Sequence, residues 1–265
     1  MLAAAVPPAS SPPALTPAEA TEIHTRILRV SLATEEARSY WEHADLAVPL
    51  PQRAVTAFER RWFGGKSLDR VRFLIATFRE RFDAFPEALP ALRRLAFADS
   101  LTRQLLCHFH VQLSDPIYRR FTGEFLVKRR SLRNLAVDRD GALRWLREEY
   151  PQRWSVATEV QFASKLLSTA SEAGLVTAKK NPRTVLVAKV PDLALAYVLH
   201  SLRAIRFEGT MLDNPYLASL SLSPSDGFLE QRLRALPGVT FRRMGDLLDF
   251  DWEHPNLLAW SEAVP

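Results

Sequence analysis

The stretch from residue 138 to residue 190 constrains the fold most, because two helical hydrophobic patterns are followed there by two β-prone runs. The first pattern covers residues 140–149 and ends before Tyr150-Pro151, since the residue before a proline disfavours helix. Its apolar positions are Ala142, Trp145 and Leu146. Ser155, a good N-cap, starts a second pattern that continues to about residue 173. The sequence therefore predicts two helices joined by a short turn.

The second predicted helix has an apolar stripe and a polar face at a 3.6-residue period. The apolar stripe comprises Val156, Val160, Ala163, Leu167 and Ala170. The polar face comprises Thr158, Gln161, Lys165, Ser168 and Thr169. Such side chains can reach phosphates and base edges, although a purely structural helix has the same pattern.

A basic hairpin is expected after this helix. Gly174 is a suitable C′ residue, and the runs 175–178 and 184–187 are rich in β-branched residues. The segment between them is Lys179-Lys180-Asn181-Pro182-Arg183, so the hairpin tip carries three cations. Two helices followed by a hairpin are typical of a winged helix-turn-helix.

Charge is unevenly distributed along the 265 residues. Residues 118–190 contain 15 Lys/Arg and 7 Asp/Glu, a net charge of +8, whereas the whole chain carries +5. The remainder is thus slightly acidic, at −3. A cationic middle in a near-neutral chain favours a polyanionic partner, and the alternative is an ordinary solvated basic face.

The rest of the chain is predicted to be almost entirely helical. Helices are expected over 17–29, 34–43 and 52–63, after Ser67, over 98–113, from Asp115-Pro116, from Pro191 and over 226–236, and a hairpin over 239–252. The last helix and hairpin resemble a second, degenerate winged unit. We expect a mainly α protein with a disordered tail at 1–17, a helical N-terminal domain at 18–133 and a winged-helix-like C-terminal domain at 134–265.

No catalytic, metal or cofactor site is expected. Gly64-Gly65-Lys66-Ser67 lacks the first glycine and the strand of a phosphate-binding loop, and Cys107, His108 and His110 suit a core helix. An acidic cluster near the C-terminus is the only candidate for divalent metal binding, and we interpret it as an exposed strand face; it comprises Asp246, Asp249, Asp251, Glu253 and His254. One cysteine and no long apolar run favour a cytoplasmic protein without a membrane contact.

Several short motifs give the chain a resemblance to a known family. Leu143-Arg144-Trp145-Leu146, Trp154-Ser155-Val156-Ala157-Thr158 and Ala173-Gly174-Leu175 resemble the BrxA family of bacterial BREX (bacteriophage exclusion) systems, and 27–252 follows a similar order of helices. The resemblance implies a non-enzymatic antiviral defence component that binds double-stranded DNA. It also implies other BREX proteins as partners, namely a methyltransferase, an ATPase and a phosphatase-like protein.

Charge and position select the candidate DNA-binding residues, with a low sequence specificity because the second helix has no outward Arg. They are Arg153, Ser155, Thr158, Gln161, Lys165, Lys179, Lys180, Arg183, Lys128, Arg129, Arg130 and Arg133. The last four belong to the basic run 128–133, which we expect to be the interdomain linker. The alternative function is a protein-protein interaction scaffold within the defence complex without direct DNA contact.

Overall fold

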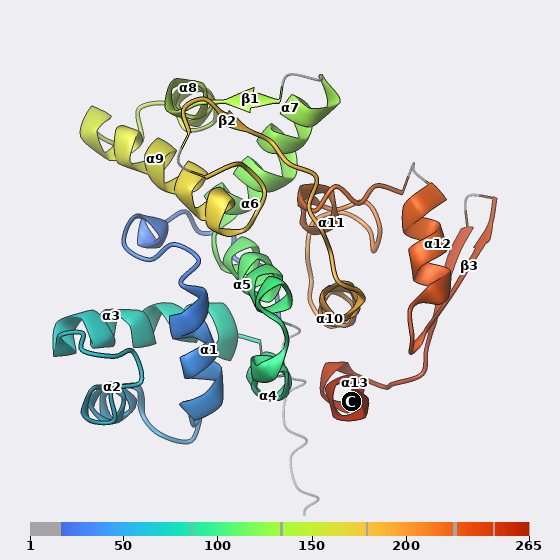
Figure 1. The fold of residues 1–265 in the computed structure, drawn as a ribbon, viewed down its shortest axis with the longest axis horizontal. Helices are drawn as coiled ribbons and strands as arrows, with labels where there is room; N and C mark the ends of the chain where they lie inside the picture. The colour runs from blue at the N-terminus through green and yellow to red at the C-terminus, as the bar shows by residue number, and fades with distance from the viewer. Residues whose placement is uncertain are drawn as a thin grey trace, which may run out of the picture.

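The computed structural model describes residues 17–85, 87–132, 135–178, 180–224, 227–245 and 247–264. Over these residues the protein is mainly helical, as predicted, with two small two-stranded antiparallel sheets (Figure 1). Within the same ranges, no helix combines the length and the apolar character needed to cross a bilayer. Arg133 and Lys179, both candidate DNA contacts, and residues 1–16 of the expected tail lie outside the described residues.

The N-terminal part consists of short helices around an aromatic core. They are η1 (Arg26–Leu28), α1 (Thr34–His43), α2 (Leu50–Glu59), α3 (Leu68–Phe78), η2 (Arg79–Asp83), α4 (Ala88–Arg94) and η3 (Leu95–Phe97). The prediction of α1 is confirmed, and Ser67 caps α3 by accepting a hydrogen bond from the amide of Arg70. The helix expected over 17–29 is wrong, because only η1 forms there. The residues before it pair with distant backbone instead, and the amide of Arg206 donates to the carbonyl of Pro17 at 2.8 Å.

Helix α5 (Ser100–Ser114) lies at the centre of the molecule (Figure 1). It packs against α1, η2, α6 (Pro116–Arg120) and α10 (Asp192–Leu202). Cys107, His108 and His110 are buried on it, so the prediction that they belong to the core is confirmed. Asp115 accepts a hydrogen bond from the amide of Tyr118, which confirms the predicted start of α6.

The two helices predicted on either side of a short turn are present as α8 (Arg139–Glu149) and α9 (Val156–Glu172). Before it, the chain continues from α6 through the π-helical turn η4 (Phe121–Phe125) into α7 (Leu126–Ser131). The expected linker at 128–133 is therefore helical as far as Ser131, because the helix extends past the point where the apolar period stops. Strand β1 (Ala136–Val137) then pairs with β2 (Arg183–Thr184).

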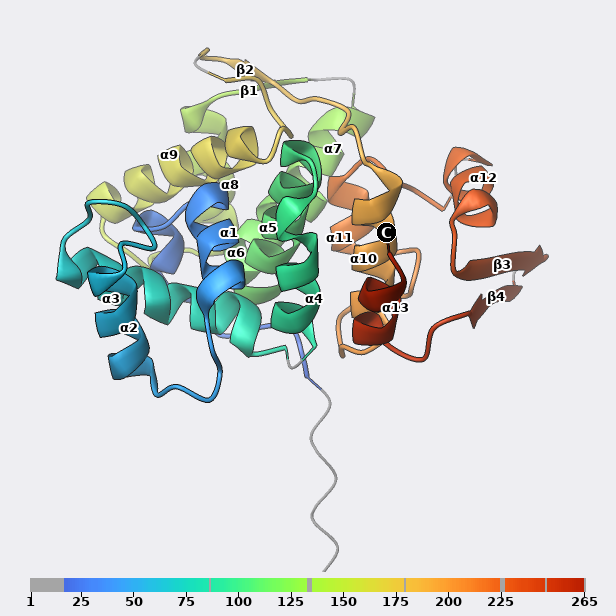
Figure 2. The same ribbon diagram turned by 60° about the horizontal axis from the view of Figure 1, so that its bottom comes forward.

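The C-terminal part continues from α10 with α11 (Pro215–Ser219), α12 (Gly227–Ala235), the β3–β4 hairpin (Val239–Met244 and Leu247–Trp252) and α13 (Leu257–Ala263). The predicted hairpin is confirmed in antiparallel register, with Phe241 opposite Phe250. It extends away from the body of the molecule (Figure 2).

Buried contacts cross the domain boundary proposed from the sequence. Helix α10 packs on α5, α13 packs on α4, and α9 packs on η1. The hydroxyl of Tyr197 on α10 lies 2.7 Å from the ring Nε2 of His110 on α5. One hydrophobic cluster includes residues from both sides, so the division at residue 133 stays a prediction.

Candidate nucleic-acid interface

Helices α8 and α9 are fastened to each other by an apolar contact and one ion pair. Ala142, Trp145 and Leu146 are buried on α8, as the helical pattern predicts. Beside them, Arg147 of α8 donates from Nε to the Glu159 carboxylate of α9 at 2.8 Å. Because Glu159 is itself buried, the ion pair helps to fix the angle between the helices.

Helix α9 begins as predicted but turns a different face to the core. The hydroxyl of Ser155 accepts a hydrogen bond from the amide of Thr158, which confirms Ser155 as the N-cap. Its buried positions are Glu159, Phe162, Ala163, Leu166, Leu167, Thr169 and Ala170. Val156 is 65% exposed and Thr169 is fully buried, so both predicted placements are wrong. Packing of α8 and η1 on the helix rotates the buried stripe away from the one expected from hydrophobicity alone.

The N-terminal half of α9 is the half that faces solvent. Ser155 and Gln161 are exposed, Thr158 and Lys165 are half-buried, and Arg153 is exposed just before the helix. At the other end, the carboxylate of Glu172 accepts a hydrogen bond from the amide of Leu32, which lies beyond η1. A nucleic acid could therefore reach the first turns of α9 more readily than the last ones.

A short hairpin follows α9, although its regular pairing is limited. Val176 and Val185 form a bridge, and the amide of Thr177 donates to the carbonyl of Thr184 at 2.9 Å. Strand β1, which the sequence did not indicate, pairs with β2 on the other side and ties the hairpin to the start of α8. Lys180 is exposed at the hairpin tip. Arg183 is half-buried, and its guanidinium donates to the carbonyl of Thr177 at 3.3 Å, so it braces the hairpin.

The basic run on α7 divides into outward and inward side chains. Lys128 is exposed and Arg129 is half-buried. Arg130 turns inward, where its guanidinium donates to the carbonyls of Ala218 at 3.4 Å and Leu186 at 3.3 Å. Arg130 therefore connects parts of the protein, which argues against the predicted phosphate contact.

A groove of about 400 Å³ lies between α7 and α8 and brings three cations together. Lys128, Arg129 and Arg144 line it, and no carboxylate of the described residues forms an ion pair with them. A Cβ atom on Gly141 would lie 3.0 Å from Oδ1 of Asp138, 3.3 Å from Nη2 of Arg129 and 3.9 Å from Nη2 of Arg144. The two guanidinium groups and the Asp138 carboxylate, which accepts a hydrogen bond from the Gly141 amide, thus border a space that a larger residue at 141 would fill.

Aromatic and acidic side chains complete this groove. The guanidinium of Arg129 lies 5.3 Å from the ring centre of Phe125. Glu124, Glu148 and Glu149 also line the groove, and the carboxylates of Glu124 and Glu149 pair with Arg120. Arg144 was not among the predicted contacts. The feature of the sequence that could have indicated it is its position one helical turn after Gly141, near the start of α8.

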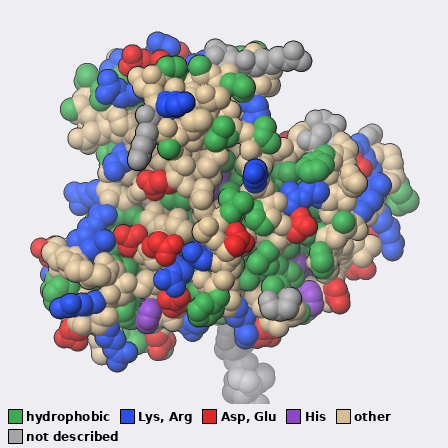
Figure 3. All heavy atoms as spheres, viewed as in Figure 1, with side chains coloured by type: hydrophobic (Ala, Val, Ile, Leu, Met, Phe, Trp, Pro, Cys, Tyr) green, Lys and Arg blue, Asp and Glu red, His purple; other side chains and the backbone are tan. Residues whose placement is uncertain are grey.

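The remaining cations of the basic middle segment are less concentrated. Arg119, Arg120 and Arg147 form ion pairs with carboxylates. On the face shown in Figure 3, Lys and Arg side chains are spread over the part formed by α7 to α9 and the β1–β2 sheet, with apolar surface between them. The arrangement suits several separate contacts to an extended anion rather than one dense patch.

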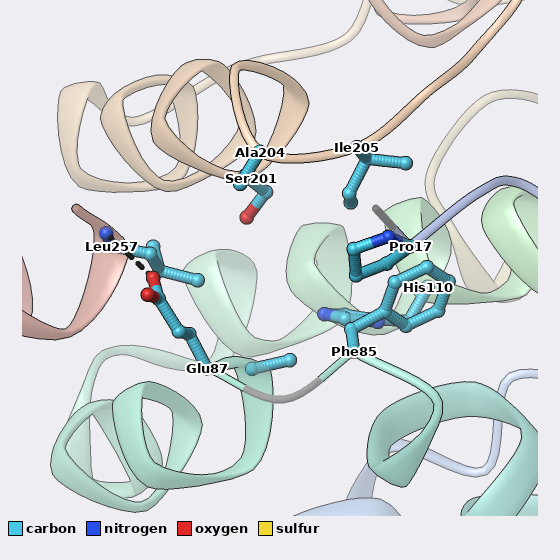
Figure 4. A pocket seen from close by; sticks show the side chains of 9 residues that line it. Pro17, Phe85, Glu87, His110, Ser201, Ala204, Ile205 and Leu257 are labelled. Atoms are coloured by element: carbon cyan, nitrogen blue, oxygen red, sulfur yellow. Dashed lines mark hydrogen bonds between the residues drawn. The ribbon is translucent and has the colours of Figure 1, made fainter. Parts of the chain in front are cut away.

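A second hollow, of about 210 Å³, lies between α4, α5, α10 and α13 and is mostly apolar (Figure 4). His110 lines it, but the carbonyl of Arg81 accepts from Nδ1 at 2.8 Å and the hydroxyl of Tyr197 donates to Nε2 at 2.7 Å. Burial lowers the pKa of His110 to about 3. With both nitrogens engaged, His110 is placed as a neutral core residue and has no free nitrogen for proton transfer.

The acidic residues near the C-terminus lie on exposed strand positions. Asp249 and Asp251 are exposed on β4, while Asp246 lies outside the described residues. Among the described residues, no three His, Cys, Asp or Glu side chains are grouped so that they could hold a metal ion. No protein-family model matches the chain, and no curated protein matches it.

Proposed function

We propose that this protein is a non-enzymatic, double-stranded DNA-binding protein in which residues 135–187 act as a winged helix-turn-helix. The observation that carries the proposal is the pairing of β1 with β2, which ties the hairpin to the start of α8 next to the exposed first turns of α9. In this type of unit the second helix enters the major groove and the hairpin lies over an adjacent backbone.

The unpaired cations would supply most of the affinity through phosphate contacts. Lys128, Arg129 and Arg144 would supply up to three such contacts from the groove between α7 and α8, while Arg153 precedes α9 and Lys180 lies at the hairpin tip. The outward positions at the start of α9 include no Arg, the residue that most often reads guanine. Binding is therefore expected to show little sequence preference and a steep dependence on salt.

The biological setting that we propose is antiphage defence. It rests on the resemblance of 143–146, 154–158 and 173–175 to the BrxA family of BREX systems. In that setting the protein would act on DNA beside a methyltransferase, an ATPase and a phosphatase-like protein.

Fluorescence anisotropy on a random-sequence duplex at several salt concentrations tests DNA binding directly. The variant replaces Lys128, Arg129 and Arg144 by Gln, which keeps side-chain bulk while removing three charges. Each lost phosphate contact lowers the slope of log K against log salt by about 0.9, so the slope should fall by up to about 2.7. The triple variant should also bind the duplex more weakly than the wild type at low salt.

A charge-matched control replaces Arg60, Arg61 and Arg72 by Gln, three exposed residues of the N-terminal part. They lie between or on α2 and α3, at the end of the molecule away from α8 (Figure 1). The control should bind like the wild type. Equal losses in both triple variants would show that only net charge matters, and no binding by the wild type at physiological salt would reject the proposed function.

A second candidate function is docking on another protein, and an apolar surface beside the hairpin favours it. Leu132, Leu135 and Val187 are 66%, 42% and 73% exposed. The carbonyl of Leu135 accepts a hydrogen bond from the amide of Val185, which places two of these side chains near β2. Replacing Leu135 and Val187 by Ser would weaken capture of a defence partner and leave DNA binding intact if the surface serves docking.

A further inference from the structure

A separate pocket of about 350 Å³ lies between α7 and α11, behind the hairpin. The surface of the pocket is largely apolar, and the polar side chains that line it are Arg130, Ser131, Asp213, Asn214, Ser221 and Ser223. The apolar side chains in the wall include Val127, Leu212, Leu222 and Pro224. This volume is at the small end of the range in which proteins bind organic ligands.

Arg130 is a half-buried cation without a counter-ion. Among the described residues its guanidinium donates only to two backbone carbonyls, at 3.3 and 3.4 Å, and its Nε is enclosed without a hydrogen-bond partner. Burial lowers the pKa of Arg130, and no neighbouring carboxylate offsets that effect. Buried charges in proteins are ordinarily paired with an opposite charge. The unpaired guanidinium of Arg130 therefore indicates a place where an anion could bind.

Ser221 is unusual in both its backbone and its side chain. Its φ of 63° lies in the left-handed region, where glycine is the usual residue at the end of a helix. The amide of Ser221 donates to the carbonyl of Ala218 at 3.0 Å, which closes the last turn of α11. Its hydroxyl is enclosed and has no partner in the described part of the chain. A strained serine with an unused hydroxyl is typical of a site that binds something.

We propose that this pocket binds a small organic monocarboxylate whose apolar body packs against Leu212, Leu222 and Pro224. One carboxylate oxygen accepts from the free N–H groups of Arg130, and the other accepts from the Ser221 hydroxyl after a rotation about its Cα–Cβ bond. A hydrogen bond between a guanidinium and a carboxylate is charge-assisted, and it is stronger than one between neutral groups. Asp213 also lines the pocket, and its negative charge disfavours a dianion such as phosphate more than it disfavours a monocarboxylate. Carboxylate binding here is independent of the proposed contact with DNA.

Isothermal titration calorimetry of the full-length protein with sodium hexanoate tests the site, with hexanamide as the uncharged isostere. Hexanoate should bind at least about tenfold more tightly than hexanamide, because only the carboxylate pairs with the guanidinium. Arg130→Gln should weaken hexanoate binding by about tenfold or more, and Ser221→Gly by about threefold to tenfold. Ser221→Gly is favoured by its backbone conformation, so this variant should be at least as stable as the wild type.

Lys128→Gln is the matched control, since it removes a cation of the same helix that lines a different groove. It should bind hexanoate like the wild type. The proposal is overturned if hexanoate and hexanamide bind equally, if Ser221→Gly binds like the wild type, or if Lys128→Gln loses as much affinity as Arg130→Gln. It is also overturned if butanoate, hexanoate and benzoate all fail to give saturable binding.

Discussion

The two buried histidines of α5, His108 and His110, should make the protein less stable in mild acid. The Nε2–H of His108 donates to the hydroxyl of Ser219 at 3.0 Å, and the hydroxyl of Tyr118 donates to its Nδ1 at 3.0 Å. This arrangement fits the neutral ring, and His110 is enclosed in a similar way. Burial lowers the pKa of both residues to about 3, from an ordinary value of 6.5.

The free energy of unfolding should fall as the pH falls, because the unfolded chain binds protons at a higher pH than the folded protein does. Below pH 6.5 the unfolded chain protonates both histidines, whereas the folded protein holds them neutral until about pH 3. Each histidine therefore removes about 1.4 kcal/mol of stability per pH unit as the pH falls through this window. Together they should lower the free energy of unfolding by about 3 kcal/mol between pH 6.5 and pH 5, a large part of the 5–15 kcal/mol typical of a domain.

Urea denaturation at pH values from 7 to 5 measures this slope. His108→Gln removes one titrating ring and keeps a donor and an acceptor in the same place, so its slope should be shallower by about 1.4 kcal/mol per pH unit. His43→Gln is the control, because His43 is exposed and its removal should leave the slope unchanged. If wild type and His108→Gln lose stability in parallel, the buried ring is not the source of the acid sensitivity.

Two further predictions concern packing and the start of α9. Gly123→Ala should destabilise the protein by about 1–3 kcal/mol, since a Cβ there would clash with Cβ of Pro215 and lie 2.7 Å from its carbonyl oxygen. The control is Gly65→Ala, whose new Cβ meets no atom within 4 Å and should change stability little. Thermal unfolding compares the two variants with the wild type. Ser155→Ala should lower the free energy of unfolding by about 1 kcal/mol, because α9 loses its N-cap. Urea denaturation measures this loss, with Ser164→Ala, at an exposed serine within the same helix, as the control. Equal losses in the two variants would contradict the role of Ser155 as a cap.

Local signals in the sequence were enough to locate many helix starts. The side chains of Ser67, Asp115 and Ser155 each accept a hydrogen bond from the amide three residues later, and such contacts can be inferred from neighbouring residues. The hairpin over β3 and β4 was also predictable, because alternation and a glycine in the turn are local features.

Pairings between distant segments could not be read in the same way. The chain from Pro17 is extended because Arg206, far away in sequence, satisfies its backbone. Strand β1 has two residues and forms only because β2 lies beside it. Short elements of this kind carry too little pattern to be recognised before the fold is known.

The candidate interface shows the same limit at the level of side chains. Charge counting selected Lys128, Arg129 and Arg130 together, yet a helix points neighbouring residues in different directions, and Arg130 faces inward. Arg144 joins Arg129 over Gly141 because α7 and α8 lie side by side, which is a tertiary feature. Composition therefore indicated the basic segment. Which of its cations face solvent depends on how the helices pack.

The central position of α5 has a practical consequence for dissecting the protein. A fragment that stops before α10 would leave His110 without the Tyr197 hydroxyl and would open the surface of α5 that α10 covers. The complementary fragment would lose the same contacts from the other side. Separately expressed halves should therefore aggregate or stay unfolded, and mixing them is a sounder way to study each half than purifying it alone.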